Sequence, residues 1–220
     1  TPMIREVEAN LRATGVKVLD IEILRVKPDT RAINWKPFFE TGARLGASQV
    51  LVAGNDPDYN RFCDNFAELC EIAHPYGLTL NVEPMPWCDI ATVKQAGDAM
   101  KRVNRPNAGV LVDPIHFFRA DNRFEDIDSL PAGSLHYCQM CDITAERPKD
   151  MDGILYQARN FRLSPGTGAA DLKTLLKHLP GLPISIEACN AELALTLSPL
   201  DRARMYLEDM VAVLNAAGEH

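Results

Sequence analysis

The sequence predicts an α/β fold, and within that class a (β/α)8 barrel of the TIM type. Six short apolar runs lie along the chain, and the first five begin roughly 30 residues apart, about the length of one strand-plus-helix unit. The runs are apolar on both faces, which is typical of strands in a parallel sheet covered by helices. Polar residues collect where the runs end, and in a barrel the ends of many strands meet on one face.

The predicted strands are short and rich in Val, Ile and Leu. No glycine-rich phosphate turn follows any of them, so a doubly wound nucleotide-binding sheet is the less favoured alternative. In chain order the predicted strands cover residues 16–24, 48–54, 78–83, 108–113, 134–140 and 183–188.

Helical periodicity is found between and after these strands. Residues 59–77 place apolar side chains three and four positions apart and end at Gly77, a residue type that favours helix termini. The last helix is expected to begin after Ser198, which caps it, with Pro199 in the first helical position. A further helix over residues 3–15 opens the chain.

The number of strands is too small for a closed barrel. A (β/α)8 barrel needs eight strands, and the helix over residues 3–15 should itself follow a strand. We therefore expect a single barrel domain over residues 1–220 that lacks its first two strands and one helix, roughly 50 residues. Either the chain is a truncated form, or a partner or a local rearrangement covers the open edge.

Composition restricts the classes of function. Lys and Arg number 23 against 30 Asp and Glu, and the net charge of -7 comes without a basic run for a phosphate backbone. No apolar stretch approaches the length of a membrane helix, and the N-terminus lacks the pattern of a signal peptide. We expect a cytoplasmic protein with a small-molecule substrate, no nucleic-acid or membrane partner, and a homo-oligomer as an open possibility.

The cysteines are expected to be reduced and structural. They are scattered over a chain large enough to fold without disulfides. The "CQMC" segment has the spacing of a redox pair or half a zinc knuckle, but on a strand Cys138 and Cys141 point to opposite faces. The six cysteines are Cys63, Cys70, Cys88, Cys138, Cys141 and Cys189.

Oxygen-bearing side chains mark the ends of four successive predicted strands. These side chains are Glu83, Asp113, Gln139 and Glu187. In a barrel they converge on one point, where three carboxylates raise one another's pKa unless a cation neutralises them. Hard oxygen ligands without thiolate favour Mg²⁺ or Mn²⁺, with Co²⁺ as a further candidate. The sequence therefore predicts one divalent metal ion at this face.

The same segments resemble the xylose-isomerase-like sugar isomerases and epimerases, a family that includes endonuclease IV. Its pattern of Glu, Asp-x-x-His, His and Glu is similar to Glu83 in "NVEP", "DPIH" over 113–116, "QMCD" over 139–142 and Glu187 in "SIEA". Family members usually carry two more βα units before this region. Gln139 departs from the pattern, since His is the commoner ligand there, but relatives that dehydrate 3-dehydroshikimate are similar in using Gln.

The resemblance implies chemistry through an enediolate, in which a metal ion acidifies the proton between a carbonyl and a hydroxyl. Glu83 and Glu187 would exchange that proton from two sides, and His116 would assist at a substrate oxygen. Arg162, in the family-like segment "RLSPGTG", is a candidate for holding a substrate phosphate or carboxylate, with a surface turn as the alternative. Trp87 is expected to wall the pocket.

Other residues receive weaker assignments. Trp35 is expected to pack at a helix start, and the face of Glu22 cannot be fixed, so it is given no role. Three arginines are anion-binding candidates that more often serve as solvated surface charges: Arg119, Arg147 and Arg159.

Several functions remain open at this point. The first is an isomerase or epimerase of a small keto-sugar or related hydroxy-carbonyl compound. The second is a lyase of the 3-dehydroshikimate dehydratase type, which Gln139 favours. A DNA-repair endonuclease is disfavoured by the charge of -7 and the five histidines. A family member without catalytic activity is the remaining alternative.

Overall fold

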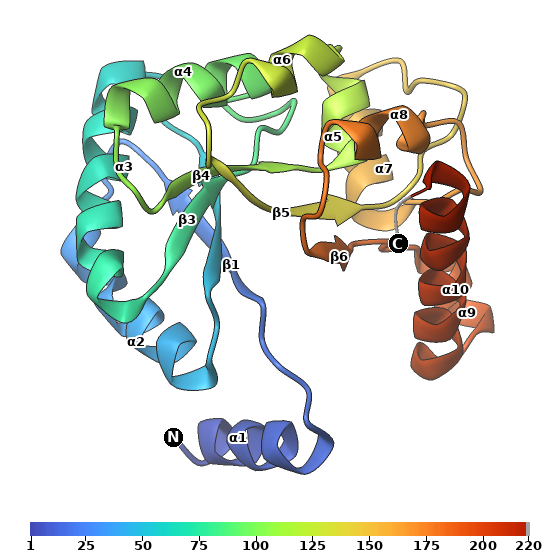
Figure 1. Cartoon of the computed structure of the whole chain (residues 1–220), viewed down its shortest axis with the longest axis horizontal. Helices are drawn as coiled ribbons and strands as arrows, with labels where there is room; N and C mark the ends of the chain where they lie inside the picture. Colours follow the sequence, from blue (N-terminus) through green and yellow to red (C-terminus); the bar gives the residue numbers. More distant parts are fainter. Residues whose placement is uncertain (219–220) are drawn as a thin grey trace.

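The protein folds around one parallel β-sheet (Figure 1). The structure is a computed structural model, and it describes residues 1–218. Within these residues the sheet has six strands in the order of the chain, and every neighbouring pair is parallel. The strands are β1 (Asp20–Val26), β2 (Gln49–Gly54), β3 (Thr79–Val82), β4 (Ala108–Val112), β5 (Leu135–Met140) and β6 (Ile184–Ile186).

The predicted strands are confirmed, with one clear correction. The first strand begins at Asp20 and not at residue 16, because residues 16–19 form a link without strand structure in which Val16 is 61% exposed. Leu19 already accepts hydrogen bonds from the amides of Ser48 and Gln49 at the start of β2. The first strand therefore begins close to the point where the backbone of β2 can form hydrogen bonds with it.

The helices lie between and after the strands. The predicted helix over 59–77 divides into an α-helix that ends at Ala73 and a 3-10 turn, η2 (His74–Tyr76), because Pro75 lacks the amide that would continue the helix. Gly77 ends the turn with a φ of 69°. The helices are α1 (Pro2–Thr14), α2 (Lys36–Leu45), α3 (Tyr59–Ala73), α4 (Val93–Val103), α5 (Pro114–Arg119), α6 (Phe124–Asp128), α7 (Met151–Asn160), α8 (Leu172–Lys177), α9 (Ala191–Thr196) and α10 (Pro199–Ala217), and a second 3-10 turn is η1 (Ala32–Trp35).

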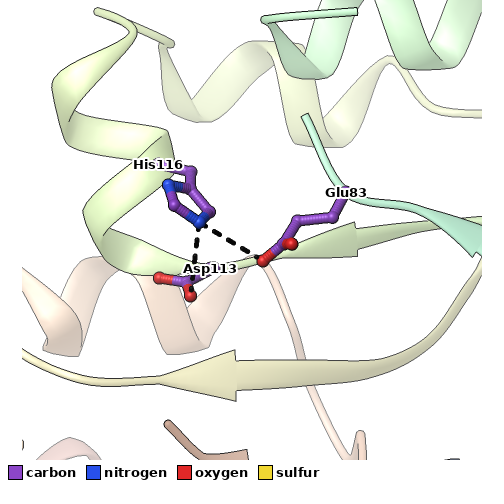
Figure 2. A group of neighbouring side chains, drawn as sticks. All are labelled: Glu83, Asp113 and His116. Carbon is purple, nitrogen blue, oxygen red and sulfur yellow. Dashed lines mark ion pairs between the residues drawn. The ribbon is translucent and has the colours of Figure 1, made fainter. Parts of the chain in front are cut away.

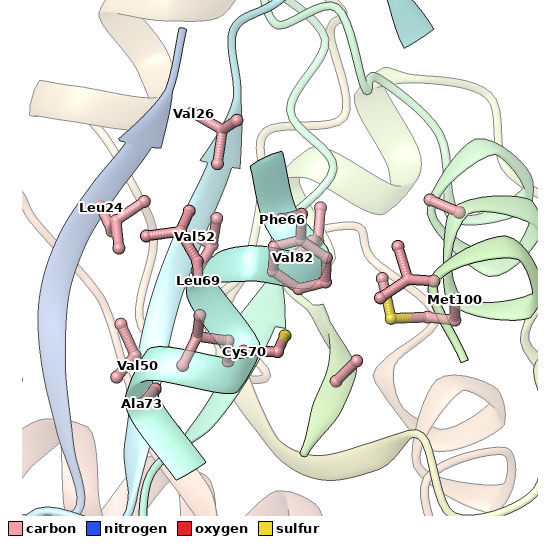
Figure 3. Close-up of a cluster of buried hydrophobic side chains, with 14 of the residues drawn as sticks. Leu24, Val26, Val50, Val52, Phe66, Leu69, Cys70, Ala73, Val82 and Met100 are labelled. Carbon is pink, nitrogen blue, oxygen red and sulfur yellow. The ribbon is translucent and has the colours of Figure 1, made fainter. Parts of the chain in front are cut away.

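Apolar side chains cover both faces of the sheet. On the outer face, α3 packs Phe66 and Leu69 against β1, β2 and β3 (Figure 3). On the inner face, Leu51, Leu111 and Tyr137 come from three different strands and pack together. Contacts between strands that are not neighbours require a curled sheet, so the strands form part of a barrel wall.

The N-terminal helix stands away from the sheet (Figure 1). None of the residues of α1 is buried, and its Glu8 forms a bidentate ion pair with Arg44 of α2, at 2.6 and 2.8 Å. Within residues 1–218, β1 and β6 each pair with one strand, so both are edges of the sheet. No helix in this part of the chain combines the length and apolarity needed to span a membrane.

Candidate active site

The carboxyl ends of the strands carry the predicted site residues to one edge of the sheet. Glu83 follows β3, and its amide still donates to Val52 of β2 at 2.9 Å. Glu187 follows β6, and its amide donates to Met140 of β5 at 3.0 Å. Both residues thus continue the backbone hydrogen bonding between neighbouring strands, because parallel pairing holds the strand ends at the same level.

Asp113 and His116 reach the site from the junction of β4 and α5. The Asp113 carboxylate caps α5 by accepting the Ile115 amide at 2.9 Å, and the spacing of three residues places His116 one turn further on the same side. Figure 2 shows the resulting cluster, in which His116 Nε2 lies 3.5 Å from Glu83 Oε1 and 3.9 Å from Asp113 Oδ2. One potential ligand atom from each residue lies within 4.8 Å of the others.

Arg162 joins this cluster from the long connection between β5 and β6. Its side chain is 4% exposed and pairs with Asp113 through Nη1 and with Glu187 through Nη2, at 3.1 Å for the second pair. Its Nε donates to the Ala158 carbonyl at 2.7 Å. Arg162 itself is therefore buried, although residues 166–168 of the same segment form an exposed turn, and the role of Arg162 toward a substrate anion stays a prediction.

Asp142 of the "QMCD" segment supports the Arg162 loop. Its carboxylate accepts the amides of Gly166 and Gly168 at 3.0 and 2.9 Å. Gly168 is required there, since a Cβ would come within 2.3 Å of the Ile143 carbonyl oxygen. The Pro-Gly-x-Gly pattern is thus explained by a loop that wraps around one buried carboxylate.

Glu22 is a site residue that the sequence did not reveal. It points from β1 across the inner face of the sheet, and its Oε1 accepts a hydrogen bond of 3.1 Å from Gln139 Nε2. Because a carboxylate accepts but does not donate, the Gln139 amide must turn its nitrogen to Glu22 and its oxygen away. The signal in the sequence was an acid between the two isoleucines Ile21 and Ile23 of the strand.

Burial and charge shift the pKa values at the site in opposite directions. Burial raises the pKa of Glu83 well above its ordinary value, and the nearby Asp113 and Glu187 raise it further. Burial also raises the pKa of Glu187 to about 8, against the effect of Arg162. Burial alone would raise the pKa of Asp113, but Arg162 outweighs it and holds the pKa below its ordinary value. Burial lowers the pKa of His116 to about 4, so the imidazole is neutral at pH 7.

The arrangement fits a hard divalent cation. Arg162 pairs with Asp113 and Glu187, and its charge also acts on the nearby carboxyl groups of Glu83 and Glu22. Two buried oxygens, Glu83 Oε1 and Gln139 Oε1, have no hydrogen-bond partner among residues 1–218. A buried acceptor without a partner is costly, and a cation would satisfy both atoms and favour the charged forms of Glu83 and Glu187, whose pKa values burial raises. Oxygen-rich donor sets of this kind favour Mg²⁺ or Mn²⁺.

Trp87 lies beside His116 of the candidate site. Its ring stands at 87° to the ring of His116, with centroids 5.0 Å apart, and it lines a neighbouring cavity. Trp35 packs edge-on against Phe38 at 5.5 Å, as predicted.

Most of the remaining candidates have structural surroundings, but Cys189 and Arg159 are exposed, so the expectation that all six cysteines are buried structural thiols is wrong for Cys189. Cys138 and Cys141 belong to separate core clusters, and burial raises the pKa of both thiols. Arg119 donates to Gln157 and Thr144, and Arg147 pairs with Asp121. Arg159 is exposed and forms no ion pair within the described residues.

Comparison with known proteins agrees with this architecture. A family model described as xylose isomerase-like TIM barrel matches residues 3–212. A 3-dehydroshikimate dehydratase of Pseudomonas aeruginosa is 29% identical over 164 residues, which are 69% of this chain and 25% of that protein. An inosose isomerase of Bacillus licheniformis is 33% identical over 120 residues, which are 54% of this chain and 41% of that protein. The matches thus span less than half the length of either relative.

A solved structure supports the fold. The crystal structure of the IolI protein with a bound zinc atom superposes with a TM-score of 0.80 at 22% identity, over 97% of this chain and 82% of that one. At this identity the likeness concerns the fold. The relatives found by sequence are enzymes, and a neighbour of the same fold binds a divalent metal ion.

Proposed function

Because the chain belongs to the xylose isomerase-like TIM barrel family, we propose that it is a metal-dependent isomerase or epimerase of a small keto-sugar or related hydroxy-carbonyl compound. One observation carries the proposal. Glu83 and Asp113 meet His116 in a buried cluster, Arg162 links Asp113 to Glu187, and the buried oxygens Glu83 Oε1 and Gln139 Oε1 lack a hydrogen-bond partner among the described residues. An inosose isomerase among the relatives supports the same class of reaction.

The residues that would hold the metal ion are Glu83, Asp113, Gln139 and Glu187. Three carboxylates and one neutral amide form a hard ligand set, for which Mn²⁺ or Mg²⁺ is the proposed ion and Co²⁺ a possible substitute. When bound, the ion would supply Lewis-acid stabilisation of negative charge on a substrate carbonyl oxygen.

The proton transfer is assigned to the protein's own carboxylates. Glu83 at the end of β3 and Glu187 at the end of β6 approach the site from strands separated by β4 and β5, so each can reach a different side of a substrate carbon. One carboxylate would remove the proton beside the carbonyl, and the other carboxyl group, already protonated, would donate its own proton to the opposite face of the resulting enediolate. The neutral imidazole of His116 can donate a hydrogen bond to a substrate oxygen without a charge of its own.

A dehydratase is the second candidate, and Gln139 is the observation that favours it. The fully buried Gln139 occupies the position where the commoner ligand of the family is His. A 3-dehydroshikimate dehydratase is also among the relatives. The initial proton removal would be the same, followed by loss of a hydroxyl group from the neighbouring carbon.

Turnover in D₂O tests the mechanism and separates the two candidates. The Mn²⁺-loaded protein is incubated with a panel of ketoses, with inosose and with 3-dehydroshikimate, and the products are analysed by NMR and mass spectrometry. We expect deuterium at the carbon next to the carbonyl, because a carboxyl group that holds the abstracted proton exchanges it with solvent. An isomerase yields a deuterated isomer, whereas a dehydratase yields a product that has lost one water. Full retention of the substrate hydrogen during turnover would exclude the proton transfer and indicate a hydride shift.

Glu22 is expected to act as a positioning residue for Gln139. Replacing Glu22 by Ala frees the Gln139 amide to rotate, so its oxygen is no longer held toward the site. Loss of such a supporting group typically weakens metal affinity by about 10- to 100-fold. Calorimetric titration with Mn²⁺ measures the effect without relying on activity.

A double-mutant cycle provides the control for Glu22. In a Gln139→Ala background, Glu22→Ala should cause no further loss of Mn²⁺ affinity, because the two side chains act as one unit. An equal loss in both backgrounds would mean that Glu22 affects the metal ion independently of Gln139, by its charge or by direct contact.

A further inference from the structure

We propose that the mouth of the barrel contains a cationic subsite that binds an oxyanion, a carboxylate or phosphate, on the substrate. This inference rests on the proposed function, since it specifies the substrate class of the same site. The subsite is a cavity of about 570 Å³, within the usual size range of small-molecule sites. It is lined by Arg25, Lys27, Pro28, Asp29, Asn55, Trp87 and Arg159.

The cavity lies at the same edge of the sheet as the carboxylates. Arg25 is in the last part of β1, Lys27 follows that strand, and Asn55 follows β2. The carboxyl ends of parallel strands share one edge, so the cations Arg25 and Lys27 at the end of β1 lie at the same mouth as the carboxyl groups that follow β3, β4 and β6. Arg159 reaches the cavity from α7.

The lining of the cavity is rich in positive charge. Three of its lining residues are cations and one, Asp29, is an acid, although the chain as a whole carries a net charge of -7. Arg25, Lys27 and Arg159 form no ion pair within residues 1–218, whereas other arginines such as Arg61 pair with a carboxylate. Cations that converge on a cavity without internal partners are suited to an external anion.

Trp87 connects the cavity to the reacting groups. Its ring lines the cavity and also stands edge-on to the His116 ring at 5.0 Å. A substrate whose anionic group lies between Arg25 and Arg159 would therefore extend past Trp87 toward Glu83 and His116. The substrate class that fits both halves is a hydroxy-carbonyl compound with a carboxylate or phosphate at a distance from the carbonyl.

The two tryptophans of the chain offer a direct readout of binding. Trp87 lines this cavity, and Trp35 lines an adjoining one of about 300 Å³ that shares Arg25, Lys27 and Asp29 with it. Tryptophan fluorescence is titrated with three probes in the presence of Mg²⁺, namely D-fructose, D-fructose 6-phosphate and 3-dehydroshikimate. The first two differ by one phosphate group, and the third carries a carboxylate.

The variants Arg25→Gln and Arg159→Gln test the subsite. Each removes one cation while keeping a polar side chain, and Arg159 is exposed on a helix, so its replacement should leave the fold intact. We expect at least one anionic probe to bind with a much higher affinity than D-fructose. Each variant should lower the affinity of the protein for that probe by about tenfold. The anionic probe that binds more tightly identifies the carboxylate or the phosphate as the preferred group. Arg204→Gln, on the exposed surface of α10, is the matched control and should bind all probes as the unmodified protein does.

The outcomes separate this inference from the proposed function. Equal binding of D-fructose and both anionic probes, or no effect of Arg25→Gln and Arg159→Gln, would overturn the subsite even if the protein turns over a neutral substrate. Conversely, anion binding that depends on Arg25 in a protein without metal-dependent turnover would support the subsite and contradict the proposed function.

Discussion

Glu187→Gln is expected to reduce turnover by roughly 10²- to 10⁴-fold, the usual contribution of a positioned acid or base. The substitution keeps the volume of the side chain and the backbone hydrogen bond from the Glu187 amide to Met140. It removes one negative charge from the proposed metal site and one of the two proposed proton carriers. Metal affinity should therefore fall together with the rate, as measured by Mn²⁺ calorimetry and by steady-state kinetics.

The matched control for this variant is Glu192→Gln. Glu192 is exposed in the first turn of α9 and has the same change in charge. It should leave metal affinity and turnover unchanged. If Glu187→Gln also kept both values, Glu187 would be neither a ligand nor a base.

Arg162→Met is expected to destabilise the metal-free protein by about 3–5 kcal/mol, the cost of removing one partner from a buried ion pair. Asp113 is fully buried beside Arg162, and without the guanidinium its charge would have no counter-charge. Urea denaturation of the metal-free protein measures the loss. Arg204→Met, at an exposed position, serves as the control for the same change in side chain.

Added metal should offset part of this loss. A divalent cation supplies positive charge near Asp113, and it binds only the folded state, so saturating Mn²⁺ should raise the stability of Arg162→Met. If Arg162→Met lost no more free energy of unfolding than Arg204→Met, the buried carboxylates of the cluster would not need Arg162 as a counter-charge. If saturating Mn²⁺ did not raise the free energy of unfolding of Arg162→Met, this result would argue against a cation site.

The parts of the site that follow from local sequence could be predicted. Glu83 and Asp113 stand directly after strong apolar runs, and Asp113 and His116 lie within one helical turn, so strand ends and spacing place them. The same reasoning identified Gln139 and Glu187 as strand-end residues.

The contacts that join distant segments could not be predicted. Glu22 and Gln139 are 117 residues apart, and Arg162 and Asp113 are 49 apart. These contacts depend on the curvature of the sheet and on the Arg162 loop, neither of which has a local signature. For the same reason the sequence did not show which face of the sheet Glu22 occupies. It also could not distinguish the exposed Arg159 from the buried Arg119, which is held by hydrogen bonds.

Anomalous diffraction from crystals grown with Mn²⁺ is the most direct test of the proposed metal site. We expect one strong peak, with oxygens of Glu83, Asp113, Gln139 and Glu187 at roughly 2.0–2.4 Å, as is usual for hard divalent ions with oxygen ligands. The Gln139 ligand atom should be its oxygen, with the nitrogen still facing Glu22. The absence of a peak at saturating Mn²⁺, or a single peak away from these four residues, would contradict the metal site and the function proposed from it.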